Sequence, residues 1–226
     1  MNIYIVSIFP EIFDSFISTS LIKKAQEKKI LKFNFVNPRI FCKDKHQQVD
    51  DAIYGGGAGM LIKAKPIIDS VEYIIKKFKL SKFKILFPSP STQIFNQKIS
   101  HSLSKIQDLI FVCGRYEGID YRWEQYIKKK YKTKFQKISL GSFVTLGGEL
   151  PTMTMIESIT RLIPGVIKES ESRKNESYSM EHNMQNLEYP QYTRPEEVLK
   201  MNVPEILLTG HSKKIQERKN KNTQTI

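Results

Sequence analysis

Glycines gather in one stretch of this 226-residue sequence, LGSFVTLGGELPTM, residues 140 to 153. Gly141, Gly147 and Gly148 lie there between an apolar run and a helical pattern, as the glycines of phosphate-binding loops do. A Walker-type loop needs a Lys for the β- and γ-phosphates and an adjacent Ser or Thr for magnesium, and neither follows these glycines. The stretch therefore offers bare main chain to a ligand, which disfavours a nucleotide-hydrolysing enzyme.

Three more segments are rich in glycine or proline. A lone cluster of this kind is most often a tight turn, but two of the three, together with the opening stretch, follow apolar runs typical of strands. In a parallel sheet the carboxyl ends of the strands meet at one edge, where ligands bind, so we expect these loops to form one pocket. The three segments are FPSPST (87–92), CGRYEGID (113–120) and YGGGAGM (54–60).

Apolar runs alternate with amphipathic patterns over roughly the first 160 residues, which predicts a mostly parallel sheet covered by helices on both faces. The clearest helical pattern is 66–79, where apolar residues recur at i, i+3, i+4 and i+7. A second follows Pro10, with Phe13, Phe16, Ile17 and Leu21 on one side. The predicted strands are 2–8, 30–36, 83–87, 108–114 and 135–140.

The sequence changes character after residues 161–166. Residues 168–194 are polar and without periodicity, which indicates a flexible interdomain linker, since a structureless stretch of that length is usually functional or disordered. Beyond it we expect a short helix from Pro195 and a basic helical tail from His211. The predicted domains are 1–167, which binds the ligand, and 195–226, which is short, helical and basic.

Composition leaves the partner open between two explanations. The formal net charge of +13 favours a polyanion such as a nucleic acid. However, 29 of the 36 basic residues are Lys, and compositional drift of a genome would also produce that excess. The seven arginines are more informative, because a guanidinium makes planar, bidentate contacts that an ammonium cannot. Arg115 and Arg161 lie in or beside the glycine segments.

Several classes of protein are disfavoured by simple features. The first apolar run lacks a preceding basic region and is broken by Pro10 and Glu11, so we expect no signal peptide. No stretch approaches the roughly 18 apolar residues of a membrane span. Cys42 and Cys113 are too few for a disulfide framework or a zinc site. We therefore expect a soluble, cytoplasmic protein that does not bind a membrane.

The first strand-to-helix turn excludes a common cofactor fold. Dinucleotide-binding proteins and Rossmann-type methyltransferases carry their glycines at that turn, but here the turn is SIFPEIF, residues 7–13, with no glycine. The ligand loops follow later strands, which indicates a different topology. Main-chain groups without Lys suit an adenine and an amino-acid moiety better than phosphates, so we predict group transfer from a small nucleoside cofactor.

These segments together carry a resemblance to a known family. The chain resembles the bacterial tRNA (guanine-N1)-methyltransferases, members of the knotted SPOUT class, over nearly its whole length. The motifs that carry the resemblance are long and occur in order: SIFPEIF (7–13), HQQVDDAIYGGGAGM (46–60), residues 110–120, SLGSFVTLGGELPTMTMIESITRLIPGV (139–166), YTRP (192–195) and VPEILLTG (203–210).

The resemblance implies an α/β fold whose mostly parallel sheet contains a deep trefoil knot, followed by a small helical C-terminal domain. It implies a homodimer with the active site at the subunit interface. It also implies S-adenosyl-L-methionine as the methyl donor, and N1 of the guanine immediately 3′ of the tRNA anticodon as the acceptor. Dependence on Mg²⁺, with Glu117 as a participant, is a further implication, although nothing in the sequence has metal-ligand spacing.

Site residues follow from the resemblance position by position. Arg161 matches an arginine that contacts the target guanine and would stabilise negative charge on O6; taken alone, it would be a solvated arginine at a helix end. Candidate RNA-binding residues are Asp50, Gly55, Gly56, Gly57, Arg115 and Arg161, although His46, Asp50 and Asp51 also suit a self-capping polar turn. The cofactor-binding candidates are Phe87, Pro88, Ser89, Pro90, Gly114, Tyr116, Glu117, Gly118, Leu140, Gly141, Ser142, Phe143, Val144, Thr145, Gly147 and Gly148.

The general base is where the sequence departs from the family. Guanine N1 carries a proton at neutral pH, so a carboxylate must accept it as the methyl group arrives. The family has an Asp in the linker; counting without a gap, that position here is Glu176. Glu169 and Glu171 are alternatives that need a gap. A rival hypothesis is a tRNA-binding protein that kept the fold and lost catalysis, for which the Asp-to-Glu change would be the evidence.

Overall fold

The computed structural model describes residues 1–167, 176–179 and 186–225. Much of the predicted linker, including Glu169 and Glu171, lies outside the described residues. The chain forms two compact units, residues 1–167 and residues 168–226. None of the helices in the described parts is long and apolar enough to cross a membrane.

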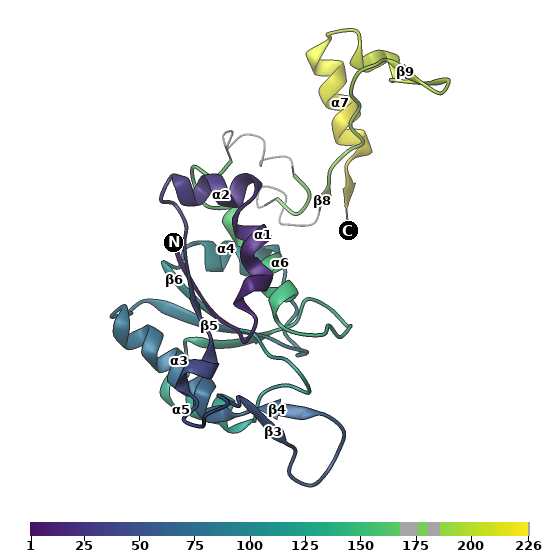
Figure 1. The fold of residues 1–226 in the computed structure, drawn as a ribbon. Coiled ribbons are helices and arrows are strands. Elements are labelled where there is room, and N and C mark those ends of the chain that lie inside the picture. Colours follow the sequence, from purple (N-terminus) through teal and green to yellow (C-terminus); the bar gives the residue numbers. More distant parts are fainter. Residues whose placement is uncertain (168–175, 180–185, 226) are drawn as a thin grey trace. The chain divides into compact units, whose positions relative to one another are not determined.

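The first unit is built on a five-stranded sheet in the order β2-β1-β6-β5-β7 (Figure 1). Every pairing in this sheet is parallel, which confirms the prediction of a mostly parallel sheet. Each predicted strand is present, with ends that differ from the predicted ones by one or two residues. The strands are β1 (Asn2–Val6), β2 (Lys32–Val36), β5 (Phe83–Pro88), β6 (Asp108–Val112) and β7 (Phe135–Ile138).

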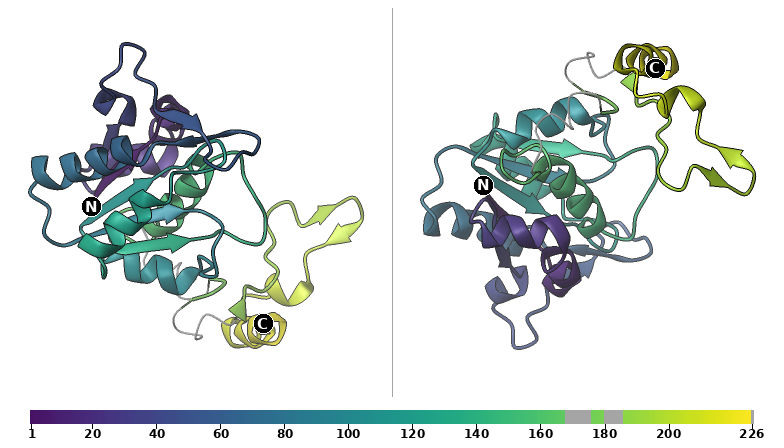
Figure 2. Two further views of the ribbon diagram at one scale, coloured as in Figure 1. Left: turned by 90° about the horizontal axis from the view of Figure 1, so that it is seen from below. Right: turned by 90° about the horizontal axis from the view of Figure 1, so that it is seen from above.

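Helices cover both faces of the sheet (Figures 1 and 2). Side chains alternate along each strand, so that Ile3 and Ile5 of β1 face one core while Tyr4 and Val6 face the other. On the first face lie η1 (Pro10–Phe13), α1 (Asp14–Ile17), α2 (Ser20–Glu27), α4 (Gln97–Ser104) and α6 (Glu149–Thr160). On the second lie η2 (Pro38–Phe41), α3 (Ala64–Lys77) and α5 (Arg122–Lys130).

The amphipathic pattern after Pro10 does not form one helix. It is divided among η1, α1 and α2, and Leu21 is 44% exposed. The chain leaves the helix at Ser18 and Thr19, where the Thr19 hydroxyl donates a hydrogen bond to the Ser15 carbonyl oxygen at 2.8 Å, and Ser20 adopts a positive φ of 50°. Such local hydrogen bonds compete with helix continuation. The pattern at 66–79, in contrast, is confirmed to within two residues as α3.

A hairpin projects from the first unit (Figure 1). It consists of β3 (Asp50–Ala52) and β4 (Met60–Ile62), paired antiparallel. Gly55, Gly56 and Gly57 in its loop all have positive φ, and a side chain at any of them would meet no other atom within 4 Å. The loop is therefore open to whatever binds there.

The predicted helix from Pro195 is wrong. The second unit has there a two-stranded hairpin of β9 (Glu197–Val198) and β10 (Met201–Asn202). Its two linking residues, Leu199 and Lys200, both have positive φ, as a type I′ turn requires, and a single helical turn has too few hydrogen bonds to form alone. The rest of the unit comprises β8 (Asn186–Leu187) paired antiparallel with β11 (Gln224–Thr225), η5 (Glu205–Leu207) and α7 (Ser212–Asn222). The unit is therefore mixed α/β rather than helical, and part of the predicted linker is a strand.

Candidate functional site

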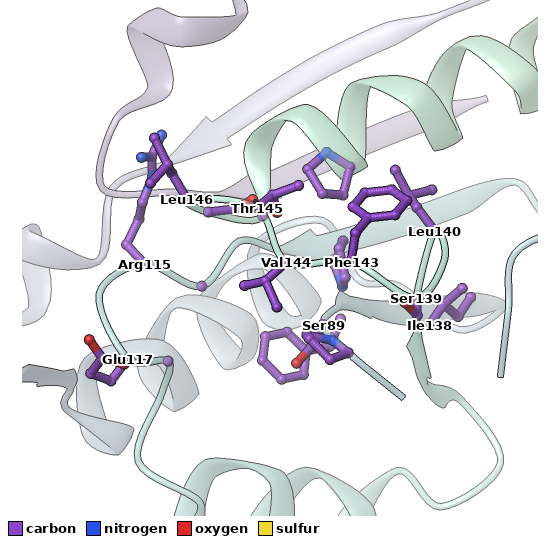
Figure 3. A pocket seen from close by; sticks show the side chains of 18 of the residues that line it. Ser89, Arg115, Glu117, Ile138, Ser139, Leu140, Phe143, Val144, Thr145 and Leu146 are labelled. Carbon is purple, nitrogen blue, oxygen red and sulfur yellow. Dashed lines mark hydrogen bonds between the residues drawn. The ribbon is translucent and has the colours of Figure 1, made fainter. Parts of the chain in front are cut away.

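Three loops meet at the carboxyl ends of β6, β5 and β7, which are neighbours in the sheet. Between them lies a cavity of about 220 Å³ (Figure 3). All the predicted cofactor residues line it except Gly141 and Ser142. The lining also includes Arg115, predicted as an RNA-binding residue, and the unpredicted Ile138, Ser139, Leu146 and Pro151. Ile138 ends β7 and Ser139 follows it at the ligand-binding edge of the sheet, which could have indicated both.

Main-chain hydrogen bonds hold the three loops together. Ser89 N–H donates to the Ile138 carbonyl oxygen at 3.0 Å, joining the loops after β5 and β7. Gly148 N–H donates to the Gly114 carbonyl oxygen at 2.9 Å, joining the loops after β7 and β6. The cavity wall is thus a set of crossed backbone segments, and its shape depends on how closely they approach.

Gly148 occupies the tightest of these crossings. A Cβ at Gly148 would lie 2.8 Å from the Cα of Cys113, a main-chain atom that cannot turn aside. Its φ is −81°, so glycine is required by the close approach of the two chains and not by backbone conformation. This position therefore keeps the start of α6 against the end of β6.

The loop after β7 is stabilised by hydrogen bonds between its own residues. The Ser139 hydroxyl donates to the Gly141 carbonyl oxygen at 2.7 Å and accepts from Gly141 N–H at 3.2 Å. The Thr145 hydroxyl donates to the Gly147 carbonyl oxygen at 2.9 Å. Gly141 shapes the turn through these bonds, which is consistent with its absence from the cavity lining.

The loop after β6 is tied to the hairpin. Tyr116 adopts a positive φ of 57° and Gly118 one of 122°, which curl the main chain so that Gly118 N–H donates to the Arg115 carbonyl oxygen at 3.0 Å. Glu117 N–H donates to the Met60 carbonyl oxygen at 3.1 Å. The cavity and the glycine-rich hairpin are thus parts of one connected structure.

A buried carboxylate organises one end of the cavity. The Glu149 side chain is 1% exposed; its Oε2 accepts from Arg115 Nε at 2.8 Å and its Oε1 from the Ser7 hydroxyl at 2.7 Å. The Arg115 guanidinium also lies over the Phe9 ring, 5.1 Å from its centroid. In Figure 3 the Arg115 side chain runs along the edge of the cavity beside Leu146. Arg115, the one cation that the described lining contains, therefore already has a carboxylate partner.

The thiol beneath the cavity is unsuited to nucleophilic catalysis. Cys113 is 1% exposed, and its Sγ lies 3.4 Å from the Thr152 hydroxyl. Burial raises the pKa of this thiol far above its ordinary value, and the nearby Glu149 carboxylate raises it further. Cys113 is therefore a neutral packing residue.

Known proteins similar to this chain identify its family. The family described as tRNA (Guanine-1)-methyltransferase TrmD matches residues 1–225. The chain belongs to this family. Relatives named tRNA (guanine-N(1)-)-methyltransferase include one from Clostridium botulinum (strain Langeland / NCTC 10281 / Type F), 46% identical over 96% of this chain and 84% of the relative. Another, from Clostridioides difficile (strain 630), is 42% identical over 96% of this chain and 90% of the relative.

A solved structure agrees with this membership. The crystal structure of tRNA (m1G37) methyltransferase from Aquifex aeolicus matches with a TM-score of 0.76 and 32% identity, covering 97% of this chain and 87% of that one. The family predicted from the sequence motifs is thus confirmed, and so is its α/β fold class. The rival hypothesis of a protein without methyltransferase activity is not favoured.

The arginine assigned to the target guanine lies elsewhere in the methyltransferase unit. Arg161, at the end of α6, lines a different cavity of about 330 Å³, together with residues of α1 and α2 such as Phe16 and Leu21. Thr160, 2% exposed, also lines it, and the described residues supply no hydrogen-bond partner for its hydroxyl. Arg161 is not among the residues that line the first cavity.

The other RNA-side candidates lie on the hairpin. Asp50 is half-buried in β3 opposite Ile62, and Gly55, Gly56 and Gly57 form its open loop. Arg115 is engaged by Glu149 as described. Glu176 belongs to the second unit, where its carbonyl oxygen accepts from Ser179 N–H at 3.1 Å. The roles assigned to these residues stay predictions.

Carboxylates are sparse around the candidate cofactor site of this family member. Of the described residues that line the first cavity, Glu117 is the only acidic one. No group of three or more His, Cys, Asp or Glu side chains suited to a metal ion occurs among the residues that the structure describes. The Mg²⁺ dependence with Glu117 as a participant therefore stays a prediction.

Proposed function

We propose that this protein transfers a methyl group from S-adenosyl-L-methionine to N1 of the guanine immediately 3′ of the tRNA anticodon, in the cytoplasm. Family membership supports methyl transfer to guanine N1 of tRNA. The observation that carries the assignment of the cofactor site is the cavity between the loops after β5, β6 and β7, which is lined by glycines and apolar side chains and has no unpaired cation among its described residues.

The lining fits a nucleoside cofactor better than a phosphate. Arg115 is already neutralised by Glu149, so the described lining offers no cation for a phosphate group. Gly114, Gly118 and Gly147 line the cavity and carry no side chain, so an adenine, a ribose or an amino-acid tail can approach the main chain closely there. When bound, S-adenosylmethionine supplies an electrophilic methyl group on a sulfonium and leaves as S-adenosylhomocysteine.

Two residues of this chain would then accept the N1 proton of the guanine and stabilise the negative charge on its O6. The carboxylate of Glu176 would accept the N1 proton of the guanine as the methyl group that S-adenosylmethionine would supply is transferred to N1. Arg161 would stabilise the negative charge that develops on O6 of the guanine. Glutamate is longer than aspartate by one methylene, which the chain around Glu176 must accommodate.

We infer that the working enzyme is a homodimer with a deep trefoil knot in each subunit. Apolar side chains beside the first cavity support the dimer, because Phe143, Val144, Leu146 and Leu150 are 59%, 84%, 91% and 65% exposed. An apolar surface of this kind usually has a partner, and a second copy of the chain is the one that the family implies. Dilution tests this inference: if the monomer alone retains full cofactor binding, the shared site is refuted. The likeness to the Aquifex enzyme supports the knot.

Transfer of a labelled methyl group to a tRNA transcript tests the proposed function. The wild type should methylate a transcript with guanine after the anticodon and not one with adenine there. Glu176→Gln should slow the transfer at least 100-fold, since general bases contribute about 10²–10⁴-fold, whereas Glu176→Asp should keep most of the activity. Full activity of Glu176→Gln would refute the base, and no transfer by the wild type at saturating cofactor would favour a protein that only binds tRNA.

A further inference from the structure

The second unit contains a cavity of its own, of about 310 Å³. It is lined by the apolar residues Leu207 and Ile215 and by residues with aromatic, amide and cationic groups. It is formed within this unit by the chain that follows β8, the 3-10 helix η5 and one side of α7. The remaining lining residues are Tyr189, Pro190, Gln191, Tyr192, Arg218, Lys219 and Asn222.

The cations of this cavity have no carboxylate partner among the described residues. Arg218 and Lys219 are half-buried, and neither takes part in any ion pair there. The C-terminal turn of α7 favours nearby cations, but its carbonyl groups carry only partial charge. Partly burying two full positive charges is costly without a counterion, so the arrangement indicates an anionic ligand.

Two aromatic rings accompany these cations. Lys219 Nζ lies 5.0 Å from the centroid of the Tyr189 ring, a cation–π contact that fixes the position of the ammonium group. Tyr192 is 48% exposed and leaves its ring available to a ligand. The Asn222 side-chain amide donates to the Arg218 carbonyl oxygen at 2.8 Å, which orders the end of α7 under the cavity.

We propose that this cavity binds one unstacked nucleotide of the tRNA, with its base on Tyr192 and its phosphate on Arg218 and Lys219. Aromatic side chains stack bases that are turned out of a helix, and neighbouring cations hold the backbone. The volume admits a nucleobase but not a duplex. The choice of tRNA as the RNA rests on the proposed function; the nucleotide chemistry rests on the cavity.

Binding of an unmodified tRNA transcript to the full-length protein at several salt concentrations tests the proposal. Tyr192→Ala should raise Kd about tenfold, the lower end of the loss expected for one stacked base, whereas Tyr192→Phe should stay within twofold of the wild type. Lys219→Gln should lower the slope of log Kd against log salt by about 1, as loss of one phosphate contact does. Lys213→Gln is the matched control, because Lys213 is exposed on the same helix and does not line the cavity.

Two outcomes would overturn the proposal. If Tyr192→Ala binds tRNA as the wild type does, the cavity serves another ligand, such as an acidic segment of a protein. If Lys213→Gln and Lys219→Gln change the slope equally, the charge acts diffusely and not in the cavity. Circular dichroism and resistance to limited proteolysis of each variant, compared with the wild type, show that the second unit is folded. A wild type that binds tRNA in this Tyr192-dependent way without methylating it would refute the proposed function alone.

Discussion

The two cavities differ in how their cations are satisfied. In the first, Arg115 is held by Glu149, a carboxylate that is 1% exposed and also accepts a hydrogen bond from Ser7. In the second, Arg218 and Lys219 have no carboxylate among the described residues. The described lining of the first cavity therefore offers no unpaired cation to a phosphate, which suits an adenosine, while the second cavity offers two cations, as a phosphate requires.

Other carboxylates of the first unit are also paired with cations. Glu72 on α3 accepts hydrogen bonds from Lys130 at 2.8 Å and from Tyr131 at 3.1 Å, which joins α3 to α5 and its end. Glu124 accepts from Lys128 at 2.9 Å and from Lys137 at 3.0 Å. Many cations of this chain thus serve the fold. Each such pair removes one positive and one negative charge, so the net charge of +13 is unchanged, and the pairs decide only which cations remain available to an RNA.

The largest loss of activity should come from adding a side chain at Gly148, where two main-chain segments approach each other closely. Gly148→Ala would bring a Cβ to 2.8 Å from the Cα of Cys113, so the start of α6 and the loop before it must move. Misplacement by about 1 Å commonly costs on the order of 100-fold in rate, and we expect that loss in kcat/KM, with cofactor Kd raised and tRNA Kd little changed. Isothermal titration with the cofactor measures its Kd, and methyl-transfer kinetics measure kcat/KM.

Gly141→Ala sharpens this test. A Cβ at Gly141 would meet the ring of Phe143 at 2.7 Å, but that side chain is 59% exposed and can turn away. We therefore expect a clearly smaller loss than for Gly148→Ala. Equal losses would mean that any added methyl group disrupts the loop, and that the backbone crossing has no special role.

A smaller effect should follow from separating Arg115 from Glu149. Glu149→Gln keeps the shape and can retain the hydrogen bond to Ser7, but removes the charge that holds Arg115. Breaking a buried ion pair strands the other charge, so we expect cofactor Kd to rise about tenfold. If Arg115 positions the loops of the first cavity, Arg115→Met should raise the cofactor Kd by a similar factor.

The tRNA affinity of Arg115→Met decides between two roles. Arg115 is a predicted RNA-binding residue, whereas in the structure it pairs with a buried acid and lines the first cavity. A raised tRNA KM with unchanged cofactor Kd would support the RNA role and contradict the positioning role.

Most of the first cavity could be predicted from sequence, because parallel strands bring their carboxyl ends to one edge and the glycine loops follow three such strands. The same rule could have indicated Ile138 and Ser139, because they lie at the carboxyl end of β7. The ion pair between Arg115 and Glu149 could not be predicted, since it joins residues 34 positions apart through a loop crossing that no periodicity records. Gly141 was predicted to contact the ligand, yet it is turned into the loop by Ser139.

The second unit was less predictable for a physical reason. Its elements are short, and the segment after Pro195 carries charge without a clear alternation or helical period, so local pattern could not separate a helix from a hairpin. The positive φ of Leu199 and Lys200 is not indicated by residue type, because Asn or Gly normally fill a type I′ turn. The cavity there is lined by both Tyr192 and Arg218, which are 26 positions apart with the hairpin, η5 and the start of α7 between them.

The smallest effect, and one confined to stability, concerns Glu72. Burial by itself raises the pKa of this carboxyl, but hydrogen bonds from Lys130, Tyr131 and Tyr126 lower it by more, so its pKa in the folded protein lies below the ordinary 4.5. A lowered pKa contributes stability above the unfolded pKa, and that stability is lost as pH falls through the folded pKa. Glu72→Gln should therefore reduce the free energy of unfolding by about 1 kcal/mol at pH 7.

The difference between wild type and Glu72→Gln should shrink as pH falls from 5 towards 3. Urea unfolding followed by the fluorescence of Trp123 measures it, because this single, fully buried tryptophan lies on α5. Glu27→Gln is the control. Glu27 Oε1 lies 3.9 Å from Lys23 Nζ, and both side chains are about 60% exposed. Exposed ion pairs of this kind contribute little to the free energy of unfolding. A difference that stayed constant across this pH range would show that Glu72 stabilises α3 and α5 through packing alone, and that the balanced charges of the first unit are incidental to its fold.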